Sequence, residues 1–262
     1  MLAQTKKGAV KYFDEQSAIY FDKNYRRIDE KYPVLCLRHN YILSMIDGHM
    51  GGALDVGCGS GAILIDLSKR GYETVGVDIS PAMVRTATEF SLRSGLAETF
   101  LSVADIENLP FADKSFDLVI CAGVVEYLDQ DDRALNEISR VLKSNGTAFI
   151  SVTNALTPFW FFETVAKVIG VWSKLLFLVK GGTSFPKARV HVPYSLINRA
   201  LKVGLVEVDR AYFHFSPFPF PLNVIFPNLC KSVGMRMENL SKSKLGFIGR
   251  GCILKFMKCL KK

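Results

Sequence analysis

The sequence predicts an α/β fold in which helices cover a parallel β-sheet within one domain. Its 262 residues, 49% of them apolar, suffice for one sizeable hydrophobic core. Apolar runs of strand length alternate with segments of helical periodicity, which is typical of parallel strands joined by right-handed crossovers. The first apolar run ends in a glycine-rich turn, LDVGCGSG, at Leu54–Gly61. These observations predict a sheet with a ligand-binding turn at a strand end.

The first part of the predicted sheet consists of two strand–helix units. Residues 52–58 form an apolar strand, and residues 60–71 form the helix after it. The second strand covers residues 73–80 and its helix residues 80–95. This second helix has a serine at its cap, a proline in its first turn and a glycine at its end, which are the residues preferred at those positions.

The rest of the chain continues the alternation and contains one insertion. The remaining predicted elements are strands at 99–105, 116–123 and 146–153, a helix at 131–146, a helix at 194–204, and strands at 205–215 and 252–260. Residues 154–182 are too long for a connection in an α/β fold, which usually has about 2–6 residues. We therefore expect an inserted, hydrophobic helical segment there.

A ligand without phosphate fits the glycine-rich turn better than a dinucleotide does. Dinucleotide-binding turns read G-x-G-x-x-G, whereas Gly57, Gly59 and Gly61 read G-x-G-x-G. Asp55 lies at the strand end, where its carboxylate would repel a pyrophosphate. The turn therefore predicts a positively charged ligand. The alternative is a turn without any ligand, although each glycine would then cost about 0.5–1 kcal/mol relative to alanine in regular structure.

Four successive motifs resemble those of the class I S-adenosylmethionine-dependent methyltransferases. They are LDVGCGSG at 54–61, VGVDIS at 75–80, VADIENLPFADKSFDLVICAGVVEYL at 103–128 and LKSNGTAFIS at 142–151. The resemblance implies a Rossmann-like, doubly wound, seven-stranded sheet of order 3-2-1-4-5-7-6 with the last strand antiparallel. It also implies S-adenosyl-L-methionine as cofactor and S-adenosyl-L-homocysteine as product.

The resemblance also implies which residues bind the cofactor. Its methionine part is expected against the glycine turn, where a Cβ would collide with it. Asp78 is expected to accept hydrogen bonds from the ribose hydroxyls, and Asp105 with Ile106 to meet adenine. A helix-capping role for Asp78 and a simple loop position for Asp105 are the alternatives. The expected cofactor-binding residues are Asp55, Gly57, Cys58, Gly59, Gly61, Asp78, Ile79, Asp105, Ile106, Cys121, Ala122, Tyr12 and Tyr20.

The N-terminal region resembles the lid helix that covers the cofactor in this family. Residues 10–25 carry Tyr12, Tyr20 and Tyr25 near helical spacing, a stripe that packing alone explains equally well. The expected parts of the single domain at 1–262 are a helical lid at 1–47, a cofactor-binding core at 50–155, the inserted segment at 156–190, and a C-terminal helix with strands at 191–262.

Methyl transfer is expected at the end of the fourth strand, in CAGVVEYL at 121–128. Metal-using family members of ubiquinone biosynthesis carry two glutamates and a histidine across this stretch, whereas this chain has Gly123, Glu126 and Tyr127. We therefore expect no metal. Transfer from a sulfonium depends mainly on alignment, so a base is needed only if the nucleophile carries a proton.

The candidate catalytic residues are Glu126, Tyr127 and His191. A helix-starting role for the glutamate and a structural role for the histidine are the alternatives. The candidate substrate-binding residues are Asn154, Trp160 and Tyr194.

The positive charge of the chain is concentrated in residues 231–262. Nine Lys or Arg and one Glu there equal the net charge of +8 of the whole chain, so the remainder is neutral. Such a tail favours an acidic neighbour, for example anionic lipid or RNA, with a solubilising role as the alternative. The six cysteines contain no C-x-x-C pair, which disfavours a zinc site or disulfide framework and suits a reducing cytosol. The start MLAQTKKGAV lacks the apolar core of a signal peptide.

The inserted run at 159–180 has the pattern of a membrane-surface helix. Glu163, Lys167 and Lys174 fall on one side of a helical projection, with large apolar residues around the rest. The run could span a bilayer by length, but its charges argue for a helix lying in the interface. A lid over the pocket or a dimer contact is the alternative. The expected location is cytoplasmic and peripheral on the inner face of the membrane.

The sequence therefore predicts a methyltransferase that acts on O, N or C of a small or lipid-like acceptor. One alternative is an RNA or protein methyltransferase, which the basic tail favours. Against it, no N-P-P-Y-like motif follows the fourth strand and no RNA-binding appendage is visible, so a nucleic-acid partner is not expected. The other alternative is a non-catalytic, cofactor-binding membrane adaptor, against which the complete set of glycines and acids argues. No oligomeric state is predicted.

Overall fold

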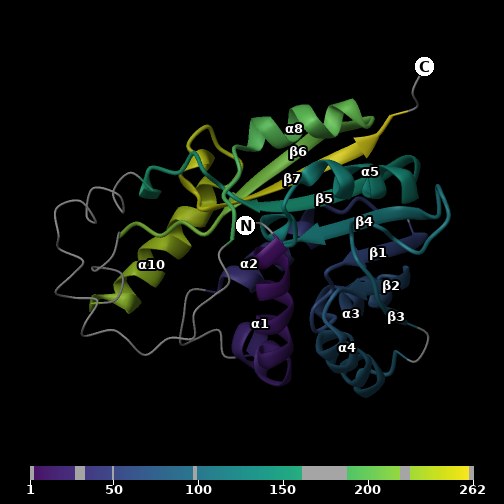
Figure 1. Cartoon of the computed structure of the whole chain (residues 1–262). Coiled ribbons are helices and arrows are strands. Elements are labelled where there is room, and N and C mark those ends of the chain that lie inside the picture. Colours follow the sequence, from purple (N-terminus) through teal and green to yellow (C-terminus); the bar gives the residue numbers. More distant parts are fainter. Residues whose placement is uncertain are drawn as a thin grey trace.

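The computed structural model describes residues 3–26, 33–48, 50–96, 99–160, 188–218 and 225–259. The strands are β1 Gly52–Val56, β2 Glu73–Asp78, β3 Phe100–Val103, β4 Phe116–Ala122, β5 Leu142–Thr153, β6 Leu205–Phe213 and β7 Gly251–Lys258. They form one seven-stranded sheet in the order β3-β2-β1-β4-β5-β7-β6 (Figure 1). Strand β7 is antiparallel to β5 and β6, while the other neighbouring strands are parallel. The expected strand order and antiparallel last strand are confirmed.

Helices cover both faces of the sheet. The α-helices are α1 Ala3–Phe21, α2 Val34–Met45, α3 Ala62–Lys69, α4 Pro81–Arg93, α5 Asp131–Val141, α8 Pro193–Lys202 and α10 Pro227–Met237. The short helices are η1 Asp22–Arg26, η2 Val125–Tyr127, η3 Glu238–Leu240 and η4 Gly246–Ile248. Helices α5 and α8 lie on one face and α3 and α4 on the other, with α1 and α2 beside the strand ends (Figure 1).

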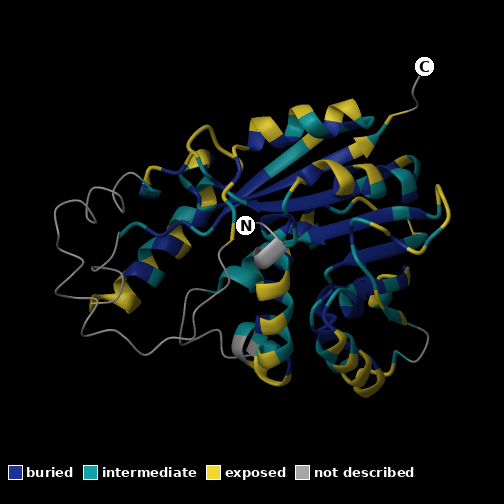
Figure 2. Cartoon of the chain, in the orientation of Figure 1, coloured by how far each residue is buried: buried dark blue, intermediate teal, exposed yellow. Residues whose placement is uncertain are grey.

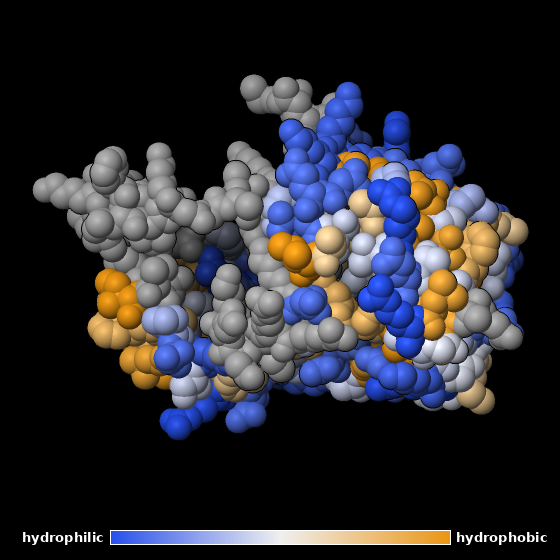
Figure 3. Space-filling model, turned by 90° about the horizontal axis from the view of Figure 1, so that it is seen from below, coloured by the Kyte–Doolittle hydropathy of each residue, from blue (hydrophilic) through white to orange (hydrophobic). Residues whose placement is uncertain are grey.

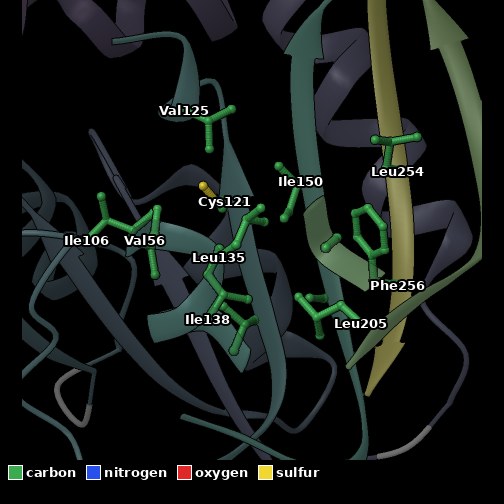
Figure 4. Close-up of a cluster of buried hydrophobic side chains, with 14 of the residues drawn as sticks. Val56, Ile106, Cys121, Val125, Leu135, Ile138, Ile150, Leu205, Leu254 and Phe256 are labelled. Atoms are coloured by element: carbon green, nitrogen blue, oxygen red, sulfur yellow. The ribbon is translucent and has the colours of Figure 1, made fainter. Parts of the chain in front are cut away.

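The core consists of two apolar layers, one on each face of the sheet. Ile42 of α2 and Leu67 of α3 belong to the first layer. Leu135 and Ile138 of α5 belong to the second, which continues to Phe256 of β7 (Figure 4). Figure 2 shows the strands between these layers as buried. Full burial contributes about 1.5–3 kcal/mol per large apolar side chain, so the layers hold the strand ends in fixed positions.

Sequence-based boundaries agree closely in the first half of the sheet and less well beyond it. The predicted cap of α4 is confirmed, because Ser80 Oγ accepts a hydrogen bond from the Met83 N–H at 3.0 Å. The helix expected to reach residue 146 ends at Val141, and β5 begins at Leu142. Leu142 pairs with Phe116 of β4, and Asn145 adopts a φ of 62°, which a helix does not allow.

Two segments after β5 differ from the sequence-based expectations in what the structure describes. Helix α10 was not predicted, because it buries only Cys230 and Gly234 and so lacks a recognisable apolar stripe. The inserted helix expected at 159–180 lies outside the described residues apart from Phe159 and Trp160.

Candidate active site

A cavity of about 640 Å³ lies at the carboxyl ends of the parallel strands. Its walls come from the segments that follow β1, β2, β3 and β4, and from α1, η1 and α2. Ligands of open α/β sheets bind at this edge, where the connections on the two faces diverge. The fold therefore places the glycine-rich turn at the expected ligand site.

Each glycine of the turn is required for a different reason. All three have positive φ, with 73° at Gly57, 54° at Gly59 and 78° at Gly61. A Cβ on Gly57 would lie 2.2 Å from Val124 Cγ2, so the expected collision there is with the protein itself. A Cβ on Gly59 would have Tyr20 Cε1, another cavity-lining atom, as its nearest neighbour at 3.6 Å. The missing side chain at Gly59 therefore leaves space for a ligand.

Two carboxylates line the cavity at the ends of β1 and β2, the buried Asp55 and the half-buried Asp78. Asp78 accepts hydrogen bonds of 2.9 Å from the backbone N–H groups of Gly59 and Ser80, and each oxygen keeps a lone pair for a ligand hydroxyl. Burial raises the pKa of Asp78. Burial and the nearby charge of Asp78 raise the pKa of Asp55 to about 7. A cation beside these acids would favour their ionised forms.

The segment after β3 supplies the opposite end of the cavity. Asp105 and Ile106 line it, and Asp105 Oδ1 accepts a 3.0 Å hydrogen bond from the Glu107 N–H. Lys6 of α1 bridges Asp105 and Glu107, with 2.6 Å between Lys6 Nζ and Glu107 Oε2. Burial alone would lower the pKa of Lys6, but hydrogen bonds to both carboxylates raise it. Lys6 was not among the predicted site residues.

The stretch after β4 lies beside tyrosines from the N-terminal helices. Glu126 is 9% exposed, lines the cavity and accepts a hydrogen bond from Thr153 Oγ1. Tyr127 lines it too, with its ring 5.6 Å from that of Phe13, and burial raises the pKa of its phenol. Tyr20 also lines the cavity. This end therefore combines a buried carboxylate with aromatic surfaces.

Arg38 of α2 is a site residue that the sequence analysis missed. It lines the cavity, and a Cβ on Gly123 would lie 2.2 Å from its Nη1, so glycine at that position makes room for the guanidinium. Within the described ranges it makes no hydrogen bond or ion pair, which leaves its donors available to an anionic ligand group. No local motif marks this arginine, because only the position of α2 brings it to the strand ends.

The predicted base His191 does not line this cavity. It is 7% exposed, and its Nε2 lies 3.2 Å from Asp131 Oδ1 in a cluster that also contains Arg189 and Arg199. Its main chain forms a bridge with Asn154, which draws it to the end of β5. Burial alone would raise the pKa of Asp131, but His191 and Arg189 lower it. The geometry supports the structural alternative for His191.

The three predicted substrate-binding residues also lie away from the cavity. Asn154 is fully buried and donates two 2.8 Å hydrogen bonds to the carbonyls of Phe247 and Gly249. The Trp160 indole donates to the Asn154 carbonyl at 2.9 Å. Tyr194 is 58% exposed and packs below the guanidinium of Arg210. The contacts of these three side chains stabilise the C-terminal part of the fold.

Most of the predicted cofactor-binding residues line the cavity. Those that do are Asp55, Gly57, Cys58, Gly59, Asp78, Ile79, Asp105, Ile106, Ala122, Tyr12 and Tyr20. Gly61 instead is the N-cap residue of α3, and Cys121 is fully buried in the second core layer. Within the described ranges, no group of three or more His, Cys, Asp and Glu side chains is placed to hold a metal.

The residues present fit S-adenosyl-L-methionine. The space beside Gly59, the acids at two strand ends and the unpaired Arg38 match a ligand with cationic centres, ribose hydroxyls and a carboxylate. The fold and this site define a class I S-adenosylmethionine-dependent methyltransferase. Residues 54–150 match the family described as Methyltransferase domain, and this part of the chain is a methyltransferase domain.

Similar proteins agree with this assignment. The chain is 28% identical over 191 residues to the "Ubiquinone biosynthesis O-methyltransferase" of Pasteurella multocida (strain Pm70), covering 69% of this chain and 76% of that protein. A relative of the same name from Rickettsia typhi (strain ATCC VR-144 / Wilmington) is 30% identical, with 52% of this chain and 57% of the relative covered. The chain thus spans little more than half of the second relative.

A solved structure shows the same fold. Geranyl diphosphate C-methyltransferase from Streptomyces coelicolor A3(2), determined with Mg²⁺, geranyl diphosphate and S-adenosyl-L-homocysteine, matches with a TM-score of 0.57 and 14% identity. The match covers 86% of this chain and 79% of that one.

Proposed function

We propose that this methyltransferase methylates a hydroxyl oxygen of a small, aromatic and amphiphilic acceptor of the quinone-precursor type. The observation that carries the proposal is the buried carboxylate of Glu126, on the cavity wall among tyrosines. Support also comes from the two relatives named for O-methylation in ubiquinone biosynthesis. Aromatic walls favour a planar acceptor through ring contacts.

We assign the cofactor-binding roles as follows. Asp78 accepts hydrogen bonds from the ribose, Asp105 and Ile106 hold the adenine, and Arg38 binds the carboxylate of the methionine part. Asp55 attracts its positive charge across the glycine-rich turn. When bound, the cofactor supplies a methyl group on a sulfonium, a leaving group that is already activated.

In the proposed reaction, Glu126 acts as a general base. Its carboxylate accepts the proton of the acceptor hydroxyl while that oxygen bonds to the methyl carbon and the methyl–sulfur bond breaks. Thr153 keeps one carboxylate oxygen in place through its hydrogen bond. Tyr20 and Tyr127 orient the acceptor ring and exclude water. Because alignment supplies much of the rate enhancement, these positioning contacts matter as much as the proton transfer.

The proposed activity is tested with labelled S-adenosyl-L-methionine and a lipid and small-molecule extract. We expect a label bound through oxygen in an apolar aromatic product, with Glu126→Gln losing about 10²–10⁴-fold in rate, the usual contribution of a general base. His191→Gln is the matched control and should retain turnover. A label on nitrogen or carbon, or in RNA or protein, would contradict the proposed acceptor class.

We further propose that the enzyme works while bound peripherally to an anionic membrane. Apolar side chains are exposed at the start of α10, namely Ile225, Phe226 and Leu229, and Figure 3 shows apolar surface at the α10 end of the molecule. Cationic residues follow them in the sequence, and a cation near anionic lipid contributes about 1 kcal/mol. These are Lys231, Arg236, Lys242 and Lys244. Within the described ranges, no helix is long and apolar enough to cross a bilayer.

Flotation with anionic and neutral vesicles tests the membrane proposal. We expect the intact chain to float with anionic vesicles at low salt, and a variant with Ile225, Phe226 and Leu229 changed to serine to float less. A variant without residues 157–182 examines the insertion separately. Equal recovery of all three proteins in the unbound fraction would contradict membrane binding and weaken the case for an amphiphilic acceptor.

A further inference from the structure

Helix α1 has a hollow on each side. Its inner side faces the 640 Å³ cavity, and a second hollow of about 610 Å³ lies along its outer side. The outer hollow is lined by Val10 and Asp14 of α1 and by Asp129 from the segment after η2. Lys6 and Ile79 line both spaces, so these two side chains form the wall between them.

Lys6 holds this wall closed through ionic contacts. Its ammonium bridges Asp105 and Glu107, which belong to the segment expected to hold the adenine. The side chain of Lys6 is 23% exposed and that of Glu107 20%, so solvent screens this bridge only partly. Ile79, by contrast, is half-buried and directly follows the last residue of β2, so the strand fixes its main chain. The movable part of the wall is therefore Lys6.

Another polar anchor of α1 lies two turns further along the helix. Asp14 Oδ1 accepts a 2.5 Å hydrogen bond from Ser80 Oγ and a 3.3 Å hydrogen bond from the Ala82 N–H. Phe13 packs edge-on against Tyr127 at the same level. Breaking the Lys6 bridge would thus free the first turns of α1 while these contacts keep the rest of the helix in place.

We propose that the outer hollow is the route by which the cofactor and its product exchange with solvent, and that Lys6 is the gate of this route. With the bridge made, the adenosine end of the cavity is separated from the hollow. With the bridge broken, the two spaces join beside Asp105. This proposal rests on the cofactor placement given above, since it requires adenosine to lie at the end of the cavity next to Lys6.

Exchange rates of S-adenosyl-L-homocysteine test the gate. For Lys6→Met we expect association and dissociation both to accelerate about ten-fold, equivalent to about 1.4 kcal/mol off each barrier, with little change in Kd. Lys69→Met is the matched control, because it removes the same charge from an exposed position on α3 that lines neither space, and it should leave both rates unchanged. A faster dissociation with an unchanged association rate would make Lys6 a simple ligand contact and overturn the gate.

A second variant tests the route itself. Val10→Trp places a large ring in the outer hollow, so we expect both rates to fall by the same factor at constant Kd. Unchanged rates in this variant, with melting temperature and helix content preserved, would overturn the route. Asp78→Ala distinguishes an error in the cofactor placement from an error in the proposed gate. An unchanged Kd there contradicts the cofactor placement, whereas a weakened Kd together with unaltered rates in Lys6→Met and Val10→Trp contradicts only the gate.

Discussion

The two halves of the sheet use buried polar side chains in opposite ways at the same edge. At the ends of β1 and β2, Asp55 and Asp78 line a cavity, and the hydrogen bonds recorded for Asp78 come only from backbone N–H groups. Near the end of β5, Asp131 at the start of α5 is bound by two arginines and His191. Both Asn154 amide hydrogens there are donated to backbone carbonyls. The first group retains bonding capacity on a cavity wall. In the second group Asp131 and the Asn154 amide are paired with protein groups, and the unpaired His191 Nδ1 faces no part of this cavity.

This difference identifies functional side chains better than residue type does. Histidine and asparagine next to the end of β5 have the chemistry of a catalytic pair, yet their partners are protein groups. A buried polar side chain with spare donors or acceptors on a cavity wall is a ligand-binding candidate, because leaving such a group unpaired costs free energy until a ligand arrives.

In the half of the sheet that lines the cavity, called the cofactor half below, the largest effect is expected from Gly59→Val. We expect at least about a 100-fold loss of affinity for S-adenosyl-L-methionine, because the side chain enters the cavity and an αL residue that is not glycine adds about 1–3 kcal/mol of strain. Gly95→Val is the matched control, since Gly95 also has positive φ but no atom lies within 4 Å of its Cβ position. Calorimetric titration measures both. Retained affinity in Gly59→Val would remove the turn from the site.

The next largest effect is expected from Asp78→Ala. Loss of a charged acceptor for the ribose hydroxyls should weaken cofactor binding by about 1.5–3 kcal/mol. Calorimetry gives the affinity, and circular dichroism checks that the fold is intact. An unchanged dissociation constant in a folded protein would leave Asp78 with the capping role alone.

For Asp131→Asn, near the end of β5, we expect a loss of stability without a loss of cofactor affinity. Removing the buried charge leaves Arg189 and His191 without their common partner, so the free energy of unfolding should fall by about 1–3 kcal/mol. The cofactor affinity should not change. Denaturant unfolding and calorimetry decide the matter, and a selective loss of affinity at constant stability would make the comparison of the two halves wrong.

Changes of pH should alter stability and cofactor affinity by smaller amounts, through the ionisation of Asp55. Its folded pKa of about 7 lies above the unfolded value, so its contribution to stability is greatest at low pH and is lost as pH rises to about 7. Affinity for the cationic cofactor should change the other way and rise about five- to ten-fold from pH 6 to 7.5, as the carboxylate ionises. Titrations of the native chain and of Asp55→Asn provide the check. A pH dependence that survives in Asp55→Asn would assign the effect to another group.

No effect at all is expected from metal removal. Gly123 and Tyr127 stand where metal-using relatives carry a carboxylate and an imidazole, so turnover and cofactor affinity should survive EDTA. Activity that disappears with EDTA and returns with magnesium would show that a metal takes part, and the role proposed for Glu126 would then change from base to ligand.

Local sequence determined the cofactor half of this protein. Positive-φ glycines, a capping serine and acids at strand ends act through their immediate neighbours, so the turn at Gly57 to Gly61, the cap at Ser80 and the positions of Asp55 and Asp78 were readable. The strand order followed from the resemblance carried by the same motifs. The end of α5 was misjudged, because Leu142 pairs with Phe116 of β4 and the positive φ of Asn145 is incompatible with a continued helix.

Tertiary structure alone decided the remainder of the site. Arg38 reaches the cavity only because α2 packs beside the strand ends and Gly123 lacks a side chain, while Lys6 meets Asp105 across 99 residues of sequence. His191 has the residue type of a base, but the sheet draws it to Asp131 instead. Such pairings depend on which distant charges the packed layers bring together, and a charge has no local pattern that reveals its partner.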